Sequence, residues 1–438
     1  MKISRKEKNS YWMPYTDNRW FKSNPKLLDS AEGMYYKTSD GKKILDGVAG
    51  LWCVNAGHCR KKIVEAVQSQ VKKMDYALSF QMGHSLAFKF AEKLVNILPK
   101  NLDHVFFTNS GSESVDTALK IALAYHQAKG NTSKTKFIGR SRGYHGSGFG
   151  GTSVGGIVAN RTQYSNLLNG VIHLPHTHIP TKNSFSKGQP KFGKEKADAL
   201  LDIINFHGKD SIAAVIVEPV AGSTGVLVPP IGYLEKLRKI CTDNDILLIF
   251  DEVITGFGRL GDSFASNRFK VFPDLITMAK GITNATVPMG AVGVTSEIYS
   301  SLYNKNKDKI ELFHGYTYSG HPLACAAGIA TLDVYEEEKL FKRAKNLEKY
   351  FGDVAHSLSR LNMVQDIRNL GLVAGIELAE RTKNSRTLGR DIFQECFEDG
   401  LMVRFTGNTI ALSPPLIVSK KEINIIFEKL EKAIKKCF

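Results

Sequence analysis

Three short runs of apolar residues, each ending in a charged residue, stand out in the pattern of the chain. They are IAAVIV (212–217), ILLIF (246–250) and LITMA (275–279). Unbroken apolar runs of this length predict strands buried on both faces of a parallel sheet. Glu218, Asp251 with Glu252, and Lys280 follow these runs. Because ligands bind at the carboxyl ends of the strands in an open α/β sheet, we expect a functional edge there.

Helical spacing of apolar residues alternates with these strands. Such spacing, or a segment between strands, predicts helices over 63–74, 232–243, 322–338 and 387–400. It also predicts a helix that begins at the turn Ser110-Gly111-Ser112 and ends before Gly130, and a last helix with Ile423 to Ile434 on one face. Shorter patterns predict a strand over 102–108, a hairpin about Ser39-Asp40-Gly41, and further strands within 362–378 and 401–405. Strand–helix alternation predicts an α/β fold with a mostly parallel central sheet, followed from about residue 340 by a smaller α+β part.

The turn Ser110-Gly111-Ser112 lies between a predicted strand and the start of a predicted helix. Free N–H groups and the helix dipole make such a position suitable for phosphate, and glycine permits close approach of the backbone. Helix capping would explain the same three residues equally well.

Asp251 and Lys280 together carry the strongest chemical signal. A lone lysine at a strand end is usually solvated, and a lone aspartate often caps a helix. A desolvated lysine, however, is a nucleophile toward carbonyls. The pair fits pyridoxal phosphate, where lysine binds the cofactor covalently and aspartate keeps the pyridine nitrogen protonated. Spacing alone leaves both interpretations open.

The sequence around this pair resembles a known family. FDEVITGFGRLG (250–261) and TMAKGITNATVPMGAV (277–292) resemble the cofactor signature of class III (ω-type) aminotransferases. Extended over residues 10–435, the resemblance is closest to the β-alanine–pyruvate (ω-amino acid–pyruvate) group. Ala285 and Thr286 stand where that group often has Gly and Ala, which bears on substrate detail rather than on cofactor use.

The resemblance implies a fold-type-I pyridoxal-phosphate transferase in three parts. Residues 1–62 would contribute to the small domain and the active-site entrance, 63–321 would form the large cofactor-binding domain, and 322–438 would form the linking helix and the small domain. It further implies a homodimer, or a tetramer, with active sites at the subunit interface.

The resemblance also assigns the site residues. Lys280 would be catalytic, and the cofactor would contact Ser110, Gly111, Ser112, Tyr144, His145, Glu218, Asp251, Val253, Lys280 and Thr317. Tyr144 would stack on the ring, and Thr317 would reach the phosphate of the partner subunit's cofactor. The substrate would contact Tyr15, Trp52, Phe80, Tyr144 and Arg404, with Phe80 entering the neighbouring subunit's site and Arg404 binding a carboxylate. From the residues alone, each loop aromatic could equally be a packing residue.

The implied reaction is transamination of an ω-amino acid, first β-alanine, with pyruvate to give malonate semialdehyde and L-alanine. Taurine–, 4-aminobutyrate– and general amine–pyruvate aminotransferases are the alternatives, and an aminomutase is a more distant one. A basic nucleic-acid-binding protein with a degenerate enzyme fold is the alternative from another class, and intact Lys280 and Asp251 argue against it.

Composition excludes several other classes. The 438 residues carry a net charge of +16 from 59 basic and 43 acidic side chains. The lysines are spread along the chain without a nucleic-acid-binding signature, so we expect no nucleic-acid partner. No apolar run reaches membrane length, and the N-terminus lacks a hydrophobic signal core, which predicts a cytoplasmic protein.

Cysteine and histidine patterns give no metal site. The six cysteines form no C-x-x-C pair. Cys53, His58 and Cys59 lack zinc spacing and a second half-site. His173, His176 and His178 share a Pro-bounded loop, where we expect no carboxylate partners.

Overall fold

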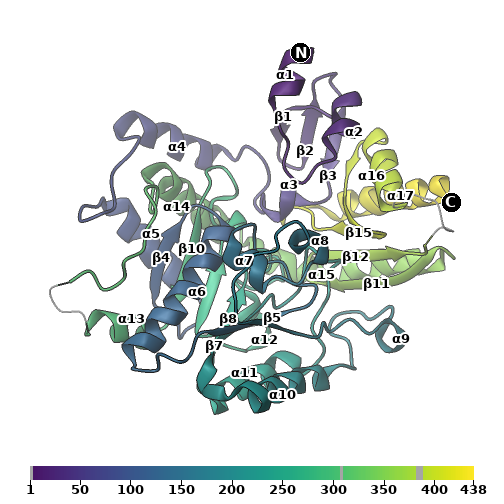
Figure 1. The fold of residues 1–438 in the computed structure, drawn as a ribbon. Helices are drawn as coiled ribbons and strands as arrows, with labels where there is room; N and C mark the ends of the chain where they lie inside the picture. Colours follow the sequence, from purple (N-terminus) through teal and green to yellow (C-terminus); the bar gives the residue numbers. More distant parts are fainter. Residues whose placement is uncertain (1–2, 306–308, 381–387) are drawn as a thin grey trace.

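The computed structural model describes residues 3–305, 309–380 and 388–438 (Figure 1). Its centre is a seven-stranded sheet of order β4-β10-β9-β8-β7-β5-β6. The strands are β4 (His104–Thr108), β5 (Lys136–Arg140), β6 (Val171–Leu174), β7 (Ile212–Val217), β8 (Leu247–Asp251), β9 (Leu275–Met278) and β10 (Gly290–Val294). Pairing from β9 through β6 is parallel, and β10 runs antiparallel to both neighbours. The predicted, mostly parallel sheet is confirmed.

Alternating side chains of the central strands pack on opposite layers of helices. Ile216 and Ile249 join the cluster formed with α6 (Gly111–Ala128) and α13 (Ser296–Tyr303). Leu248 and Phe250 join the cluster formed with α10 (Ala199–His207) and α11 (Tyr233–Asp243). Because side chains alternate with period two, residues 249 and 251 face α6, while 248 and 250 face α11. Burial on both faces explains the unbroken apolar runs.

Two four-stranded sheets form the smaller part. One has the order β1 (Leu28–Glu32), β2 (Tyr35–Thr38), β3 (Lys43–Asp46), β13 (Leu401–Met402), and the other β11 (Val364–Leu370), β12 (Val373–Leu378), β15 (Thr409–Leu412), β14 (Arg404–Thr406). The β2–β3 pair is the expected hairpin, with Gly41 at a φ of 89°. β13 pairs in parallel with β3, so both ends of the chain share this part (Figure 1, purple beside yellow). The expected α+β part is confirmed, and its exact boundaries stay a prediction.

Four of the remaining helices were predicted from the sequence, and the others were not. Those expected are α4 (Lys61–Lys73), α14 (Pro322–Glu337), α16 (Leu388–Glu398) and α17 (Lys420–Cys437). Residue 387, the expected start of α16, lies outside the described residues. The others are α1 (Arg5–Ser10), α2 (Asn18–Ser23), α3 (Ala49–Trp52), α5 (Ser85–Val95), α7 (Phe149–Val154), α8 (Val158–Arg161), α9 (Pro180–Asn183), α12 (Ala265–Phe269) and α15 (Leu340–His356). Among the described residues, we find no helix with the length and apolar character to cross a membrane.

Arg259 joins the central sheet to the smaller part. Its side chain is fully buried and donates hydrogen bonds to Leu372 O (3.2 Å), Pro414 O (2.6 Å) and Asn55 Oδ1 (2.7 Å). Within the described ranges no carboxylate pairs with it, and burial lowers the pKa of Arg259 to about 10. Leu372 and Pro414 lie beside β12 and β15 of the smaller part, so the Arg259 side chain ties the segment that follows β8 to that part.

Candidate active site

Asp251 ends β8 on the α6 face of the sheet and is 5% exposed. Its carboxylate accepts hydrogen bonds from Thr277 Oγ1 (3.1 Å) and Val253 N (3.2 Å), and lies 2.8 Å from His145 Nδ1. His145 is also buried, and its Nε2 has no partner in the described part of the chain. Three donors therefore fix the Asp251 carboxylate. The Nε2 atom of the buried His145 ring forms no hydrogen bond with the described residues.

Glu252, the next residue, binds segments on the opposite face of the sheet. It is fully buried and accepts from Ala265 N (2.5 Å), Ser266 N (2.8 Å), Ser266 Oγ (2.5 Å) and Thr255 Oγ1 (2.9 Å). Burial raises the pKa of Glu252, and these donors oppose that rise. Because two of the donors are amides at the start of α12, the carboxylate fixes this helix. The two carboxylates that close the apolar run thus have separate roles.

Lys280 lies directly after β9, as the first residue of a 3-10 turn (Lys280–Thr283), with a φ of 54°. Burial lowers the pKa of its ammonium, which the Cys53 thiol and the Asp251 carboxylate oppose. Its amine forms no hydrogen bond or ion pair with any described residue. A lowered pKa increases the fraction of free amine, which is the nucleophilic form.

The turn before α6 packs against the segments that carry these two residues. A Cβ at Gly111 would lie 3.1 Å from the Val253 side chain and 3.5 Å from that of Ala279. Ser110 caps the helix through Glu113 N (3.2 Å). The amides of the first helical turn have no acceptors within the helix, and they point outward from its positive end. This turn, beside Lys280, fits the phosphate of pyridoxal phosphate.

Glu218 and Tyr144 border the same edge. Glu218 is 4% exposed and accepts from Tyr144 N (2.9 Å) and Gly222 N (3.2 Å). Burial raises the pKa of Glu218, and His145 opposes the rise. Burial likewise raises the pKa of Tyr144. The hydroxyl of Tyr15, an exposed residue, lies 3.5 Å from Ser147 Oγ. The segment that bears Tyr15 therefore lies beside the loop that carries Tyr144 and Ser147, and its role at the active-site entrance stays a prediction.

Arg404 opens β14 on the small-domain side of this group. Burial lowers the pKa of its guanidinium, which Tyr144 opposes. Arg404 in turn is one of the charges that lower the pKa of Lys280. Its Nε is buried and has no partner among the described residues. A cation with an unused donor therefore lies in the neighbourhood of Lys280, where an anionic group of a ligand would pair with it.

Two predicted residues, Phe80 and Thr317, lie on exposed loops, where Phe80 lies against Gly315 and Tyr76 Oη donates to Thr317 O (3.0 Å). Trp52 is 2% exposed and packs with Val220 and Ile254, and its Nε1 has no partner among the described residues. The predicted roles of Phe80 and Thr317 depend on a partner chain, and the predicted contact of Trp52 with the substrate stays a prediction.

Two features were not predicted from the sequence. Thr277, which donates to Asp251, could have been found because it lies two residues before Ala279 on the α6 face of β9. The expectation that His178 has no carboxylate partner is wrong: its Nε2 lies 3.5 Å from Glu377, and Asp366 is close. Arg368 already pairs with both carboxylates, so its guanidinium supplies the positive charge between Asp366 and Glu377.

Comparison with known proteins agrees with this geometry. The family model "Aminotransferase class-III" matches residues 18–434. The chain is 59% identical over 426 residues to an omega-aminotransferase of Caulobacter vibrioides, covering 97% of each chain. It is 45% identical to a beta-alanine–pyruvate aminotransferase of Pseudomonas aeruginosa, covering 97% of this chain and 95% of the relative.

Solved structures give the same result. The crystal structure of a thermostable six-fold mutant omega transaminase from Pseudomonas jessenii superposes with a TM-score of 0.94 at 31% identity, covering 100% and 99% of the two chains. The Pseudomonas jessenii omega transaminase in complex with PMP superposes with a TM-score of 0.93. The family model, the two relatives and the shared fold together show that this chain is a class-III aminotransferase, a pyridoxal-phosphate-dependent enzyme of fold type I.

Proposed function

We propose that this enzyme transfers the amino group of β-alanine, or of a similar ω-amino acid, to pyruvate, with malonate semialdehyde and L-alanine as the products for β-alanine. The observation that supports the proposal is that Asp251 and Lys280, at one edge of the central sheet, lie in the neighbourhood of Arg404 from the smaller part. The names of the relatives from Caulobacter vibrioides and Pseudomonas aeruginosa support the class of substrate.

The proposed roles of the cofactor residues follow from their positions. Bound pyridoxal phosphate supplies an electron sink for the negative charge that develops on the amino-bearing carbon of the substrate. Lys280 holds the cofactor covalently, and its Nζ, once released, removes the proton from that carbon. Asp251, held by His145 and Thr277, keeps the pyridine nitrogen protonated.

The surrounding residues bind and orient. Ser110, Gly111 and Ser112 bind the phosphate at the start of α6, where the amides are free. Tyr144 would stack on the ring, Val253 would contact the cofactor, and Glu218, which accepts a hydrogen bond from the backbone amide of Tyr144, would lie near the cofactor hydroxyl.

Substrate recognition is assigned to the opposite wall. Arg404 binds the substrate carboxylate, because its planar fork suits a carboxylate and its Nε is otherwise unused. Tyr15 and Trp52 border the substrate. Trp52 immediately precedes Cys53, whose thiol shifts the pKa of Lys280, so this segment passes beside the reactive amine.

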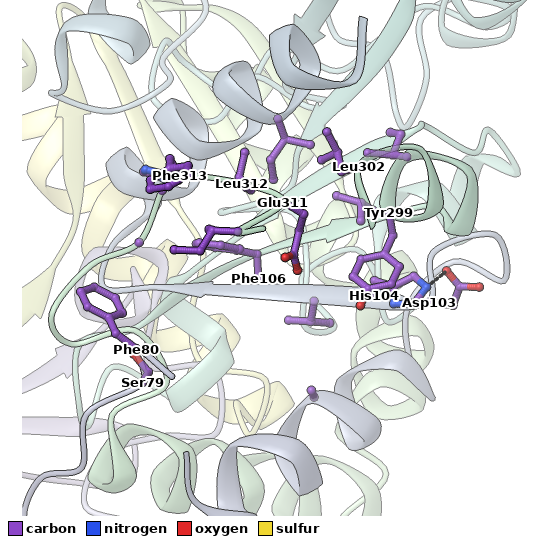
Figure 2. Close-up of a pocket in the computed structure, with 18 of the residues that line it drawn as sticks. Ser79, Phe80, Asp103, His104, Phe106, Tyr299, Leu302, Glu311, Leu312 and Phe313 are labelled. Carbon is purple, nitrogen blue, oxygen red and sulfur yellow. Dashed lines mark ion pairs between the residues drawn. The ribbon is translucent and has the colours of Figure 1, made fainter. Parts of the chain in front are cut away.

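A second copy of the chain completes the site in our proposal. A cavity of about 1160 Å³ lies along the edge strand β4 and is lined mainly by apolar and aromatic side chains, with Glu92, Asp103 and Glu311 among the charged ones. Figure 2 shows Phe80 and Phe313 at one end of it, and His104 with Tyr299 at the other. Phe80 is 55% exposed and Phe313 is 87% exposed. Apolar surface of this extent is typical of a subunit interface.

A mixing experiment tests the contribution of the partner. Lys280→Ala and Thr317→Asp chains are each expected to be inactive as homodimers. In a mixed dimer, one site would combine intact Lys280 with intact Thr317 from the other chain, and activity would return to about a quarter to a half of the wild-type level. If Thr317 served its own chain, no mixed site would be intact, so a mixture without activity contradicts the arrangement.

A donor panel tests the substrate assignment. β-Alanine, taurine, 4-aminobutyrate and a simple amine are offered with pyruvate, and alanine formation is followed. We expect β-alanine to give the highest kcat/KM. In Arg404→Ala we expect the KM for pyruvate to rise about tenfold or more, while the KM for the simple amine changes less, because pyruvate carries a carboxylate and the simple amine does not. A higher kcat/KM for another donor reassigns the substrate, and equal losses exclude the carboxylate role of Arg404.

A further inference from the structure

The backbone next to Lys280 is held by a tyrosine from a distant helix. Tyr335 lies in α14, is 3% exposed, and donates a hydrogen bond from its hydroxyl to Gly281 O at 2.7 Å. Burial raises the pKa of Tyr335 far above its usual range, so the hydroxyl stays protonated and remains a donor. The other donor to this carbonyl is Asn284 N, at 3.3 Å.

Two further groups close the space beside the α-carbon of Gly281. A Cβ built on Gly281 would lie 2.9 Å from Asn55 Nδ2 and 2.9 Å from Phe257 Cβ. Asn55 is itself fixed, because its Nδ2 donates to Phe257 O (2.9 Å) and its Oδ1 accepts from Arg259 (2.7 Å). Gly281, the residue that follows Lys280, is therefore held by Tyr335 at its carbonyl and by Asn55 and Phe257 at its α-carbon.

This confinement matters because Lys280 is strained. Its φ of 54° lies in the left-handed region, which is unfavourable for a residue with a side chain. Such a conformation persists only when its surroundings determine it. The Lys280 carbonyl accepts only backbone hydrogen bonds among the described residues, including one from Ala285 N (3.1 Å). The next carbonyl, that of Gly281, accepts one from a side chain.

We propose that Tyr335 is a positioning residue for Lys280: by holding the carbonyl of Gly281, its hydroxyl keeps the lysine backbone left-handed and aims the amine at the reacting carbon. The inference rests on the proposed role of Lys280. Without the hydroxyl, the Gly281 carbonyl is held less firmly, the backbone at Lys280 becomes more mobile, and the amine spends less time within reach of the proton that it transfers. Displacement of a catalytic group by about 1 Å costs up to roughly 100-fold in rate.

The experiment compares Tyr335→Phe with Tyr125→Phe. Tyr125 is a matched control, since it is 5% exposed and donates one hydrogen bond of 2.8 Å to Glu297, on helices away from Lys280. Three quantities are measured in both variants: amide hydrogen exchange of a peptide spanning residues 275–286, the pH titration of the absorbance of the covalently bound cofactor, and kcat and KM with β-alanine and pyruvate.

For Tyr335→Phe we expect about tenfold faster exchange in that peptide, a shifted titration, and a kcat about tenfold lower with KM changed less than about twofold. Tyr125→Phe leaves all three at the wild-type values. A purely structural role would lower the thermal midpoint of both variants and leave the titration and kcat unchanged, which would overturn the proposal.

Failure of the proposed function gives a different result. If wild-type enzyme forms no alanine from any donor, the substrate assignment is wrong, while the exchange and titration measurements still decide the role of Tyr335. If exchange accelerates but the titration and kcat stay at wild-type values, the hydroxyl does not position Lys280 for catalysis and the inference is wrong.

Discussion

Two adjacent carboxylates, on opposite faces of the central sheet, differ in their hydrogen-bond donors. On the α11 and α12 face, Glu252 receives four hydrogen bonds, two of them from backbone amides at the start of a helix. On the α6 face, Asp251 receives side-chain donors from His145 and Thr277 and only one amide. Both groups are at most 5% exposed.

Burial of a carboxylate therefore does not by itself mark a catalytic group. What separates the two is the surroundings: Glu252 is satisfied by the helix it holds, whereas Asp251 lies among Lys280, Glu218 and a buried histidine nitrogen without a partner. In a group that stabilises the fold, the protein itself fills the hydrogen-bonding positions. A group that binds a ligand keeps some of these positions for the ligand.

The largest effect is expected on the α6 face. Lys280→Ala removes the amine that binds the cofactor and transfers the proton, so turnover should fall by more than about 10³-fold. The absorbance of the covalently bound cofactor should disappear, and borohydride should no longer fix the cofactor to the chain. An unchanged spectrum would contradict the assignment of Lys280.

Asp251→Asn keeps the shape of the side chain and removes its charge. Because the pyridine nitrogen would lose its counter-charge, we expect kcat to fall about 10²- to 10³-fold, with the thermal midpoint little changed. Turnover measured beside a thermal melt checks this, and a folded variant with normal kcat would remove Asp251 from the proposed mechanism.

Glu252→Gln, one residue later, should give the inverse result. The amide of glutamine would face donors that now have no acceptor, so we expect a loss of about 2 kcal/mol in the free energy of unfolding. The kcat of the remaining folded enzyme should match wild type. If Glu252→Gln instead abolished turnover without loss of stability, the two faces would not differ in the way described.

The smallest effect concerns the stability of the cofactor-free protein. Folding lowers the pKa of Lys280, so between its folded value and its ordinary value near 10.4 the unfolded chain binds more protons, and stability rises with pH. Lys280→Met removes this dependence, and we expect its thermal midpoint to exceed that of wild type by roughly 1–2 °C at pH 7. The difference should shrink as the pH approaches 10; a constant difference would exclude the titration of Lys280 as its cause.

Much of the α6 face could be predicted from the sequence. The runs before Glu218, Asp251 and Lys280 are apolar because both of their faces are buried, and the strand ends follow directly from the parallel order. The resemblance of the motifs to a family then gave Tyr144 and Arg404, which no periodicity would indicate.

Other features could not be predicted because they depend on residues far apart in the chain. Tyr335 lies 54 positions from Gly281, and Glu377 lies about 200 positions from His178. A buried tyrosine on an apolar helix carries no local signal of its hydroxyl partner. Trp52 packs against Val220 and Ile254, which are likewise distant in the chain, and its contact with the substrate stays a prediction.

Arg259 has a mechanical consequence. Pulling the smaller part away from the central sheet would strip a fully buried guanidinium of two carbonyl acceptors at once, at a cost of several kcal/mol. We therefore expect the two parts to move little relative to one another. Substrates are then expected to enter through local shifts in exposed segments, such as the one that carries Tyr15. The distance between the two parts of the molecule would stay the same.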